Sequence, residues 1–198
     1  TWRFCVDSLV GASPEMLIAA SHGTASSRVL AGTCKPGEGT MLASSQKDLR
    51  EHELASESVS SILTSLCSDV RAQGPFLLTL PNVVHLATDV RARLGSAHLL
   101  DLVAALHPTA AVCGTPRAAA MRLIEELEDT ERGRYSGPVG WVDTAGNGEF
   151  AIALRCGLTS GTRLRLFAGA GIMPDSDPDA ELAETEAKMR PLLDALGV

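Results

Sequence analysis

The apolar and polar positions of the chain follow two different periods, and this pattern predicts its elements. Residues 2–6 alternate as a strand does, the turn signal GASP stands at 11–14, and residues 15–20 form a second apolar run, so we expect a hairpin over residues 1–21. Residues 28–40 predict a short strand followed by a Gly- and Pro-rich loop. Apolar and β-branched residues bunched on either side of Pro81 predict two further strands.

Helical spacing is clearest in residues 44–70, where leucine, isoleucine and valine recur on one side and Ser44 or Ser45 can cap the start. Three more helices are expected: residues 96–108, residues 115–129 with Pro116 near the first turn, and a last helix that begins at Asp177-Pro178.

Two elements separate these last helices. Residues 137–157 predict a hairpin that turns at Gly146-Asn147-Gly148, and residues 162–172 predict a strand that ends in glycines. Strands and helices alternate without regularity along the chain. The order therefore favours an α+β fold, with largely antiparallel sheets flanked by helices.

Composition narrows the class of protein. The chain has 198 residues, 45% of them hydrophobic, which is enough for one domain or for two tightly joined lobes. A formal net charge of -7 would repel a polyanion, so nucleic-acid binding is excluded. Five scattered cysteines without a CxxC pair favour a reducing, cytoplasmic compartment. No apolar run reaches the roughly 20 residues that a bilayer span needs, which argues against a membrane partner.

Acidic residues at helical spacing occur in two remote segments. Asp48, Glu51 and His52 are expected on one face of the first long helix, and Glu181, Glu184 and Lys188 on one face of the last. Carboxylates from two helices can share a hard cation such as Mg²⁺, which keeps positions open for an anionic substrate. Ordinary solvated helix faces explain the same spacing.

Three other features can carry chemistry: a pair of glycines, an arginine and a histidine. Gly169 and Gly171 end a strand, where their N–H groups can point at a carboxylate. Arg155 is expected at the end of a strand, where its guanidinium suits a carboxylate, and His85 lies within a strand. A packing turn would also explain the two glycines, and an internal salt bridge would also explain Arg155. A hydrogen-bonded structural histidine is the more common explanation of a residue such as His85. Glu15, after a turn, is uninformative by itself.

Nine short segments occur in a fixed order and are far more specific together than singly. They are GASPE, LAGT, KDLREHEL, HLATD, HPTAAVCGTP, YSGPVGW, GNGEFAIALRC, FAGAGI and SDPDAELAETEAK. In this order they resemble the chorismate-utilising enzymes, a family that includes isochorismate, salicylate, anthranilate and aminodeoxychorismate synthases. The resemblance extends over nearly the whole chain. It implies that residues 1–198 are the C-terminal portion of a chorismate-binding domain.

Within the family, two segments favour isochorismate synthase. HPTAAVCGTP and GWVDTAGNGEF are most similar to that enzyme, whereas anthranilate synthases usually have SGAPK and a GY with Asp. Salicylate synthases tend to carry threonine at the position of Ala111. A salicylate synthase and a non-catalytic chorismate-binding domain remain alternatives. Amination of the anthranilate type is less favoured, because it needs an ammonia source.

The resemblance implies a role for each candidate residue. Glu51 and Glu184 match the main Mg²⁺ ligands, with Asp48 and Glu181 as an outer pair. The metal would hold the ring carboxylate of chorismate. The implied contacts to substrate are Lys188 and the backbone of Gly169, Ala170 and Gly171 at a carboxylate, Tyr135 and Arg155 at the enolpyruvyl carboxylate, and Gly32, Thr33, His85, Ala111 and Leu154 around the ring.

Glu15 gains a meaning only from the resemblance. It matches the general acid that protonates the departing C4 hydroxyl while water adds at C2, which converts chorismate to isochorismate. A carboxyl with that role must be protonated at working pH, so burial or neighbouring acids must raise its pKa. The family's isochorismate synthases suggest a monomer. The sequence leaves open whether isochorismate feeds menaquinone, a catechol siderophore or salicylate.

The chain departs from the family pattern at two places. The family's water-activating lysine lies well upstream of the GASPE glutamate, and fourteen residues precede Glu15 here. The loop over residues 34–40 is also shorter than family members usually have. Two interpretations follow: a longer protein with its front and one loop missing, or a domain that binds chorismate without converting it.

Overall fold

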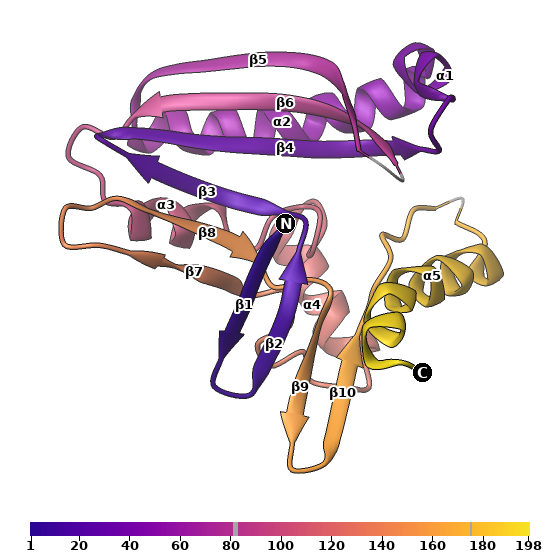
Figure 1. Ribbon diagram of the computed structural model, residues 1–198. Coiled ribbons are helices and arrows are strands. Elements are labelled where there is room, and N and C mark those ends of the chain that lie inside the picture. The colour runs from indigo at the N-terminus through magenta and orange to yellow at the C-terminus, as the bar shows by residue number, and fades with distance from the viewer. Residues whose placement is uncertain (81–82, 175) are drawn as a thin grey trace. The chain divides into compact units, whose positions relative to one another are not determined.

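The computed structural model describes residues 1–80, 83–174 and 176–198, and they fall into two compact units (Figure 1). Unit 1 comprises residues 1–15, 108–140 and 151–198, and unit 2 comprises residues 16–107 and 141–150. Pro81, on either side of which two strands were predicted, lies outside the described residues. Across the described residues, no helix combines the length and apolarity that a bilayer crossing requires.

Unit 2 is built on a sheet covered by a long helix. The six-stranded sheet has the order β5-β6-β4-β3-β8-β7, and the register of β4 with β3 and with β6, and of β5 with β6, is antiparallel. Helix α2 packs along β4, β5 and β6 (Figure 1). The strands of this sheet are β3 (Met16–Ser21), β4 (Thr24–Cys34), β5 (Ser68–Thr79), β6 (Val84–Arg93), β7 (Pro138–Val142) and β8 (Gly148–Ile152).

The helices of unit 2 begin where the sequence supplies a cap. The Ser45 hydroxyl accepts the Asp48 N–H at the start of α2, which satisfies one of the free N–H groups of the first turn. At the start of α3, the Asp101 carboxylate accepts the His98 N–H at 2.9 Å. The helices are α1 (Gly39–Ser44), α2 (Gln46–Leu66) and α3 (Leu99–Leu106). Their apolar faces close a core that includes Ile18, Leu63, Leu86, Val90, Leu99, Leu102 and Leu106.

Unit 1 contains a smaller sheet and two helices. Its four strands have the order β1-β2-β9-β10, and all three pairings are antiparallel. A Cβ on Gly11 would lie 2.6 Å from Cys156 Cβ and 2.8 Å from the Arg155 oxygen, so only glycine lets β2 approach β9 here. The elements are β1 (Trp2–Val6), β2 (Leu9–Ser13), β9 (Cys156–Ser160), β10 (Arg163–Phe167), α4 (Arg117–Leu127) and α5 (Pro178–Leu196).

The structure confirms the α+β class with antiparallel sheets, and it corrects several elements. The first hairpin joins β1 to β2 through Asp7, whose φ of 52° makes the tight turn, and GASP instead ends β2 before β3 begins in the other sheet. Helix α1 and strand β9 were not predicted. Of the two serines predicted as a possible cap, Ser45 caps α2; the predicted start of the last helix at Asp177-Pro178 is confirmed, and Pro116 precedes α4.

Candidate active site

Glu15 lies in unit 1, in the short link that follows β2. Its N–H donates to the Ser13 hydroxyl at 3.1 Å, and its carbonyl accepts from the Ile152 N–H at 3.1 Å. Ser13 is completely buried, so both ends of this link are anchored and the Glu15 side chain has a defined origin. Burial raises the pKa of Glu15 above its ordinary value of 4.5, and the charges of Arg155 and Lys188 act in the opposite direction.

Arg155 follows β8 and precedes β9, so the prediction that it ends a strand is wrong. Its φ of 47° is left-handed, which is rare for a residue with a long side chain. The Ala12 N–H donates to its carbonyl at 3.1 Å, and this bond fixes the bend to β2. The half-buried guanidinium acts electrostatically on both Glu15 and Tyr135. Leu154, also half-buried, precedes it.

Lys188 connects α5 to the predicted glycine turn. Its ammonium donates to the Gly169 carbonyl at 3.0 Å and forms an ion pair with Glu184, one turn earlier on the helix. The Lys188 side chain is 26% exposed, against 51% for Glu184. Glu181 accepts a hydrogen bond of 2.6 Å from the Ser176 hydroxyl. The structure therefore brings the acidic face of α5 and the glycine turn together within unit 1.

Gly169 is needed for close approach rather than for backbone freedom. A Cβ at this position would lie 3.1 Å from the Tyr135 hydroxyl, whereas a Cβ on Gly171 would meet nothing within 4 Å. The Tyr135 ring stacks on Phe167 with centroids 5.1 Å apart. Burial raises the pKa of Tyr135, so its hydroxyl stays neutral and able to donate. Ala170 lies half-buried between the two glycines.

The loop that carries Ala111 is held by an arginine that the sequence had not singled out. Arg132 donates to the Val112 carbonyl at 2.7 Å and pairs with the Glu128 carboxylate through two nitrogens. The Tyr135 N–H donates to the Arg132 carbonyl at 2.9 Å. Ala111 itself is exposed beside Val112. Arg132 thus contacts the Ala111 loop through its guanidinium and the start of the Tyr135 segment through its carbonyl.

In unit 2, Gly32, Thr33 and His85 lie side by side on two neighbouring strands. Thr33 on β4 pairs with His85 on β6, and the Thr33 hydroxyl lies 2.8 Å from the His85 Nδ1. Gly32 has a φ of 81°, and a Cβ there would lie 3.4 Å from Asp48 Cβ. Burial lowers the pKa of His85 and a backbone hydrogen bond with Gly32 acts against it, so the ring is neutral near pH 7.

The acidic start of α2 borders a pocket. Thr33, Glu38 and Asp48 line a cavity of about 240 Å³ together with Cys34, Met41, Leu42 and Ser45. The half-buried Asp48 carboxylate accepts from the Ser45 hydroxyl that caps the helix, so one of its oxygens is already partnered. Glu51, one turn later, is exposed.

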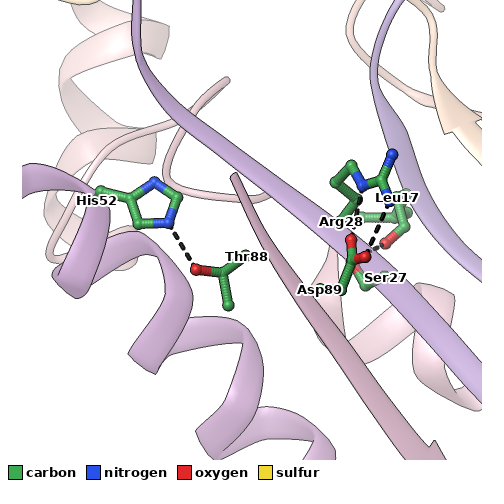
Figure 2. Close-up of polar contacts among 6 residues, drawn as sticks. All are labelled: Leu17, Ser27, Arg28, His52, Thr88 and Asp89. Carbon is green, nitrogen blue, oxygen red and sulfur yellow. Dashed lines mark hydrogen bonds and ion pairs between the residues drawn. The ribbon is translucent and has the colours of Figure 1, made fainter. Parts of the chain in front are cut away.

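His52 does not join the acidic group that the sequence predicted for this helix. It is 1% exposed, its Nδ1 contacts the Ala31 carbonyl, and its Nε2 contacts the Thr88 hydroxyl, the second contact being drawn in Figure 2. Within the described part of the chain, no three His, Cys, Asp or Glu side chains gather closely enough to hold a metal ion. Asp48 and Glu51 belong to unit 2, whereas Glu181 and Glu184 belong to unit 1.

Sequence reasoning missed three residues that hold the candidates in place, Ser13, Ser176 and Arg132, and gave His52 the wrong surroundings. Ser13, Ser176, Arg132 and His52 each bond to a candidate residue or to its chain neighbour. Two of them carry a readable signal: a serine two positions before the Glu15 N–H is a common turn pattern, and His52 lies eleven residues before Leu63, on the same helix side. The other two depend on tertiary contacts.

Comparison with known proteins gives the family. The family model for chorismate binding enzyme matches residues 3–197. The isochorismate synthase MenF of Bacillus subtilis (strain 168) is 42% identical over 200 residues, which cover 96% of this chain and 42% of that protein.

Two solved structures share the fold. The menaquinone-specific isochorismate synthase MenF from Escherichia coli has a TM-score of 0.85 at 32% identity, covering 93% of this chain and 45% of that one. Anthranilate synthase component I from Streptococcus pneumoniae TIGR4 has a TM-score of 0.84 at 30% identity, covering 92% and 42%. This chain spans a little under half the length of these proteins. By the family match over nearly its whole length, the chain belongs to the chorismate-binding enzymes.

Proposed function

We propose that this chain carries the chemistry of a Mg²⁺-dependent isochorismate synthase, which converts chorismate to isochorismate as a cytoplasmic monomer. The observation that carries the proposal is Glu15, whose pKa burial raises while two cations, Arg155 and Lys188, act on the same carboxyl. This combination suits a proton donor beside an anionic substrate. The 42% identity to an isochorismate synthase of Bacillus subtilis supports the reaction type.

The proposed role of Glu15 is to protonate the C4 hydroxyl as it leaves. Water adds at C2 and gives up one proton to a general base, both ring double bonds shift by one position, and the C4 oxygen takes the Glu15 proton and departs as water, so no oxidant and no covalent intermediate is required. A carboxyl whose pKa lies near the working pH transfers its proton most effectively. Burial shifts the pKa of Glu15 upward, in this direction. The bonds to Ser13 and Ile152 keep the origin of its side chain fixed.

Unit 1 also supplies groups for carboxylates. Lys188 lies against the Gly169 carbonyl, and Gly169 lets the Tyr135 hydroxyl approach the turn. We assign Lys188 and the backbone of residues 169–171 to one carboxylate of chorismate, and Tyr135 with Arg155 to the enolpyruvyl carboxylate. A neutral phenol and a guanidinium both donate, which is what a carboxylate accepts.

The metal is assigned to carboxylates of both units. Glu51 and Glu184 would be the main Mg²⁺ ligands, with Asp48 and Glu181 as the outer pair. The donor set fits, because all four ligands are carboxylates and both outer residues already accept a serine hydroxyl that orients them. When bound, Mg²⁺ would neutralise and orient the ring carboxylate. Glu184 would then exchange its ion pair with Lys188 for the metal.

The ring is assigned to neutral side chains. Gly32, Thr33 and His85 of unit 2 and Ala111 and Leu154 of unit 1 would surround it. Ala111, where salicylate synthases tend to have threonine, favours isochorismate as the product over salicylate. Fold similarity does not decide between reactions, since anthranilate synthase component I has nearly the same TM-score as an isochorismate synthase. The choice therefore depends on these local residues.

The test is product analysis by mass spectrometry after incubation with chorismate and Mg²⁺. Isochorismate is the expected product; salicylate with pyruvate would make the chain a salicylate synthase, and unchanged chorismate would leave a binding domain. Glu184→Gln should lower Mg²⁺-dependent turnover at least about a hundredfold. Glu186→Gln, an exposed position on the same helix, is the matched control and should not change it. Equal turnover in both variants would assign the α5 acids to a solvated surface.

A further inference from the structure

The ladder between β4 and β6 is interrupted at the residues assigned to the substrate ring. Leu30 pairs with Ala87 and Thr33 pairs with His85, so β4 has one more residue than β6 between these pairs. Ala31 and Gly32 therefore form a bulge. A bulge leaves a backbone N–H or C=O without its ladder partner, and another group must hydrogen-bond to it if the region is buried.

His52 supplies the missing partner from α2. Its Nδ1 lies 3.1 Å from the Ala31 carbonyl oxygen, and its Nε2 lies 2.7 Å from the Thr88 hydroxyl on β6, as Figure 2 shows for Thr88. A carbonyl oxygen can only accept, so Nδ1 carries the proton. The Thr88 hydroxyl can donate to Nε2, so both ring nitrogens are satisfied. His52 and Thr88 are only 1% and 4% exposed.

This ring joins three elements that carry candidate residues. Helix α2 bears Asp48 and Glu51, β4 bears the bulge, and β6 bears His85. Strand β5 leaves room for the contact at a glycine, because a Cβ on Gly74 would lie 2.5 Å from the Thr88 hydroxyl oxygen. The Thr88 side chain is therefore confined from both sides, and the imidazole cannot turn without losing one of its bonds.

We propose that His52 is a positioning residue, which through the Ala31 carbonyl sets the bulge and so the placement of Gly32 and Thr33 for a cyclic carboxylate substrate. The inference rests on the proposed function for the identity of that substrate. Gly32 shows why placement matters, because it lies close to the Leu86 side chain: a Cβ added at Gly32 would be 3.2 Å from it. Thr33, one residue later, holds the His85 ring. A shift of the bulge would move both.

Two variants separate positioning from simple packing. In His52→Asn the amide nitrogen takes the place of Nδ1 and can still donate to the Ala31 carbonyl. In His52→Gln the amide reaches the place of Nε2 and can bond only to Thr88. Each variant loses one hydrogen bond, and Asn is also one methylene shorter than Gln, so a purely packing role would make His52→Asn the more damaging variant. We expect the opposite order for binding: the KM for chorismate should rise about tenfold more in His52→Gln than in His52→Asn, with similar kcat and with a melting temperature no lower in His52→Gln. Equal KM values, or KM values that follow the melting temperatures, would overturn the proposal.

A second measurement needs no turnover. In the intact chain, ¹⁵N signals of the His52 ring should show a protonated Nδ1 and an unprotonated Nε2, and hydrogen exchange at the Gly32 and Thr33 amides should be slow. His52→Gln should speed exchange at both amides about tenfold more than His52→Asn. A ring protonated at Nε2 alone would overturn the proposal. If the chain does not convert chorismate, the proposed function fails while these signals still decide whether His52 fixes the bulge.

Discussion

Unit 1 and unit 2 hold their candidate residues by different forces. In unit 1 the residues are coupled by charge: Arg155 and Lys188 both act on Glu15, and Lys188 pairs with Glu184. In unit 2 the contacts are neutral hydrogen bonds, from Thr33 to His85 and from His52 to the bulge. The difference indicates that the charged groups around Glu15 control its proton, whereas the neutral contacts in unit 2 control the placement of Gly32, Thr33 and His85.

The backbone shows the same division. Arg155 in unit 1 stands in a left-handed conformation between two strands, and Glu15 lies in a link between two sheets. Such positions cost conformational energy and persist where surrounding bonds hold them. In unit 2 the candidates lie on regular elements, and the bulge at residues 31 and 32 is the local departure next to Thr33. Changes at Glu15 should therefore affect chemistry, and changes at the ring residues of unit 2 should affect binding.

The largest expected effect is that of Glu15→Gln. The amide keeps the shape and cannot supply a proton, so kcat should fall about 10²- to 10⁴-fold while chorismate affinity changes little. Steady-state kinetics with a separate binding titration checks both. Glu57→Gln, on an exposed position of α2, is the control and should match the original protein. A Glu15→Gln protein with a raised KM and an unchanged kcat would mean that unit 1 uses this carboxyl for binding alone.

Thr33→Val tests the other side of the comparison and should have a smaller effect. Valine keeps the volume and removes the hydroxyl that lies 2.8 Å from the His85 Nδ1. The loss of one neutral hydrogen bond should raise KM about 3- to 10-fold and leave kcat unchanged.

A matched variant controls for stability. Thr159→Val removes a hydroxyl that donates to the Ser8 carbonyl at 3.1 Å in unit 1, so it should cost similar stability without changing KM. If Thr33→Val lowered kcat as strongly as Glu15→Gln, the division between chemistry at Glu15 and binding at the ring residues of unit 2 would be wrong.

Most of the fold could be predicted from period, caps and turn residues. Helix α2, with Ser45 at its start, and α5, with Asp177, were predicted from these signals and are confirmed. Helix α1 was missed because it has six residues and no side-chain cap. The first turn was assigned to GASP because glycine and proline are the strongest turn signals, while Asp7 makes the turn through a left-handed φ. Local signals fail where a tertiary contact fixes the backbone.

The candidate residues show the same limit. Spacing placed His52 beside Asp48 and Glu51, but a helical face shared with Leu63 is a core face, and His52 is buried with it. The resemblance to a family, not spacing, gave Glu15 its role. Its burial and its two cationic neighbours come from β2, the link after β8, and α5, which are far apart in sequence. The sequence alone does not give the burial of Glu15 or identify its cationic neighbours.

The pH dependence of stability should show the smallest effect, and it tests the environment of Glu15 without substrate. Burial raises the pKa of Glu15 in the folded protein above the ordinary value of 4.5, so the folded state binds this proton more tightly than the unfolded chain. The stability that this group contributes is fully present below the unfolded pKa. It is lost as the pH rises through the folded pKa.

A glutamine at position 15 stays neutral at every pH and has no such loss. The unfolding free energy of Glu15→Gln should therefore increase relative to the original protein as the pH rises from below 4.5 through the folded pKa, and the difference should then level off. Urea unfolding of both proteins at a series of pH values measures this difference. A difference that decreased with rising pH would mean that Arg155 and Lys188 outweigh burial and keep the carboxylate ionised. Glu15 would then be an anionic partner of the two cations, and the proton-donor role proposed for unit 1 would be lost.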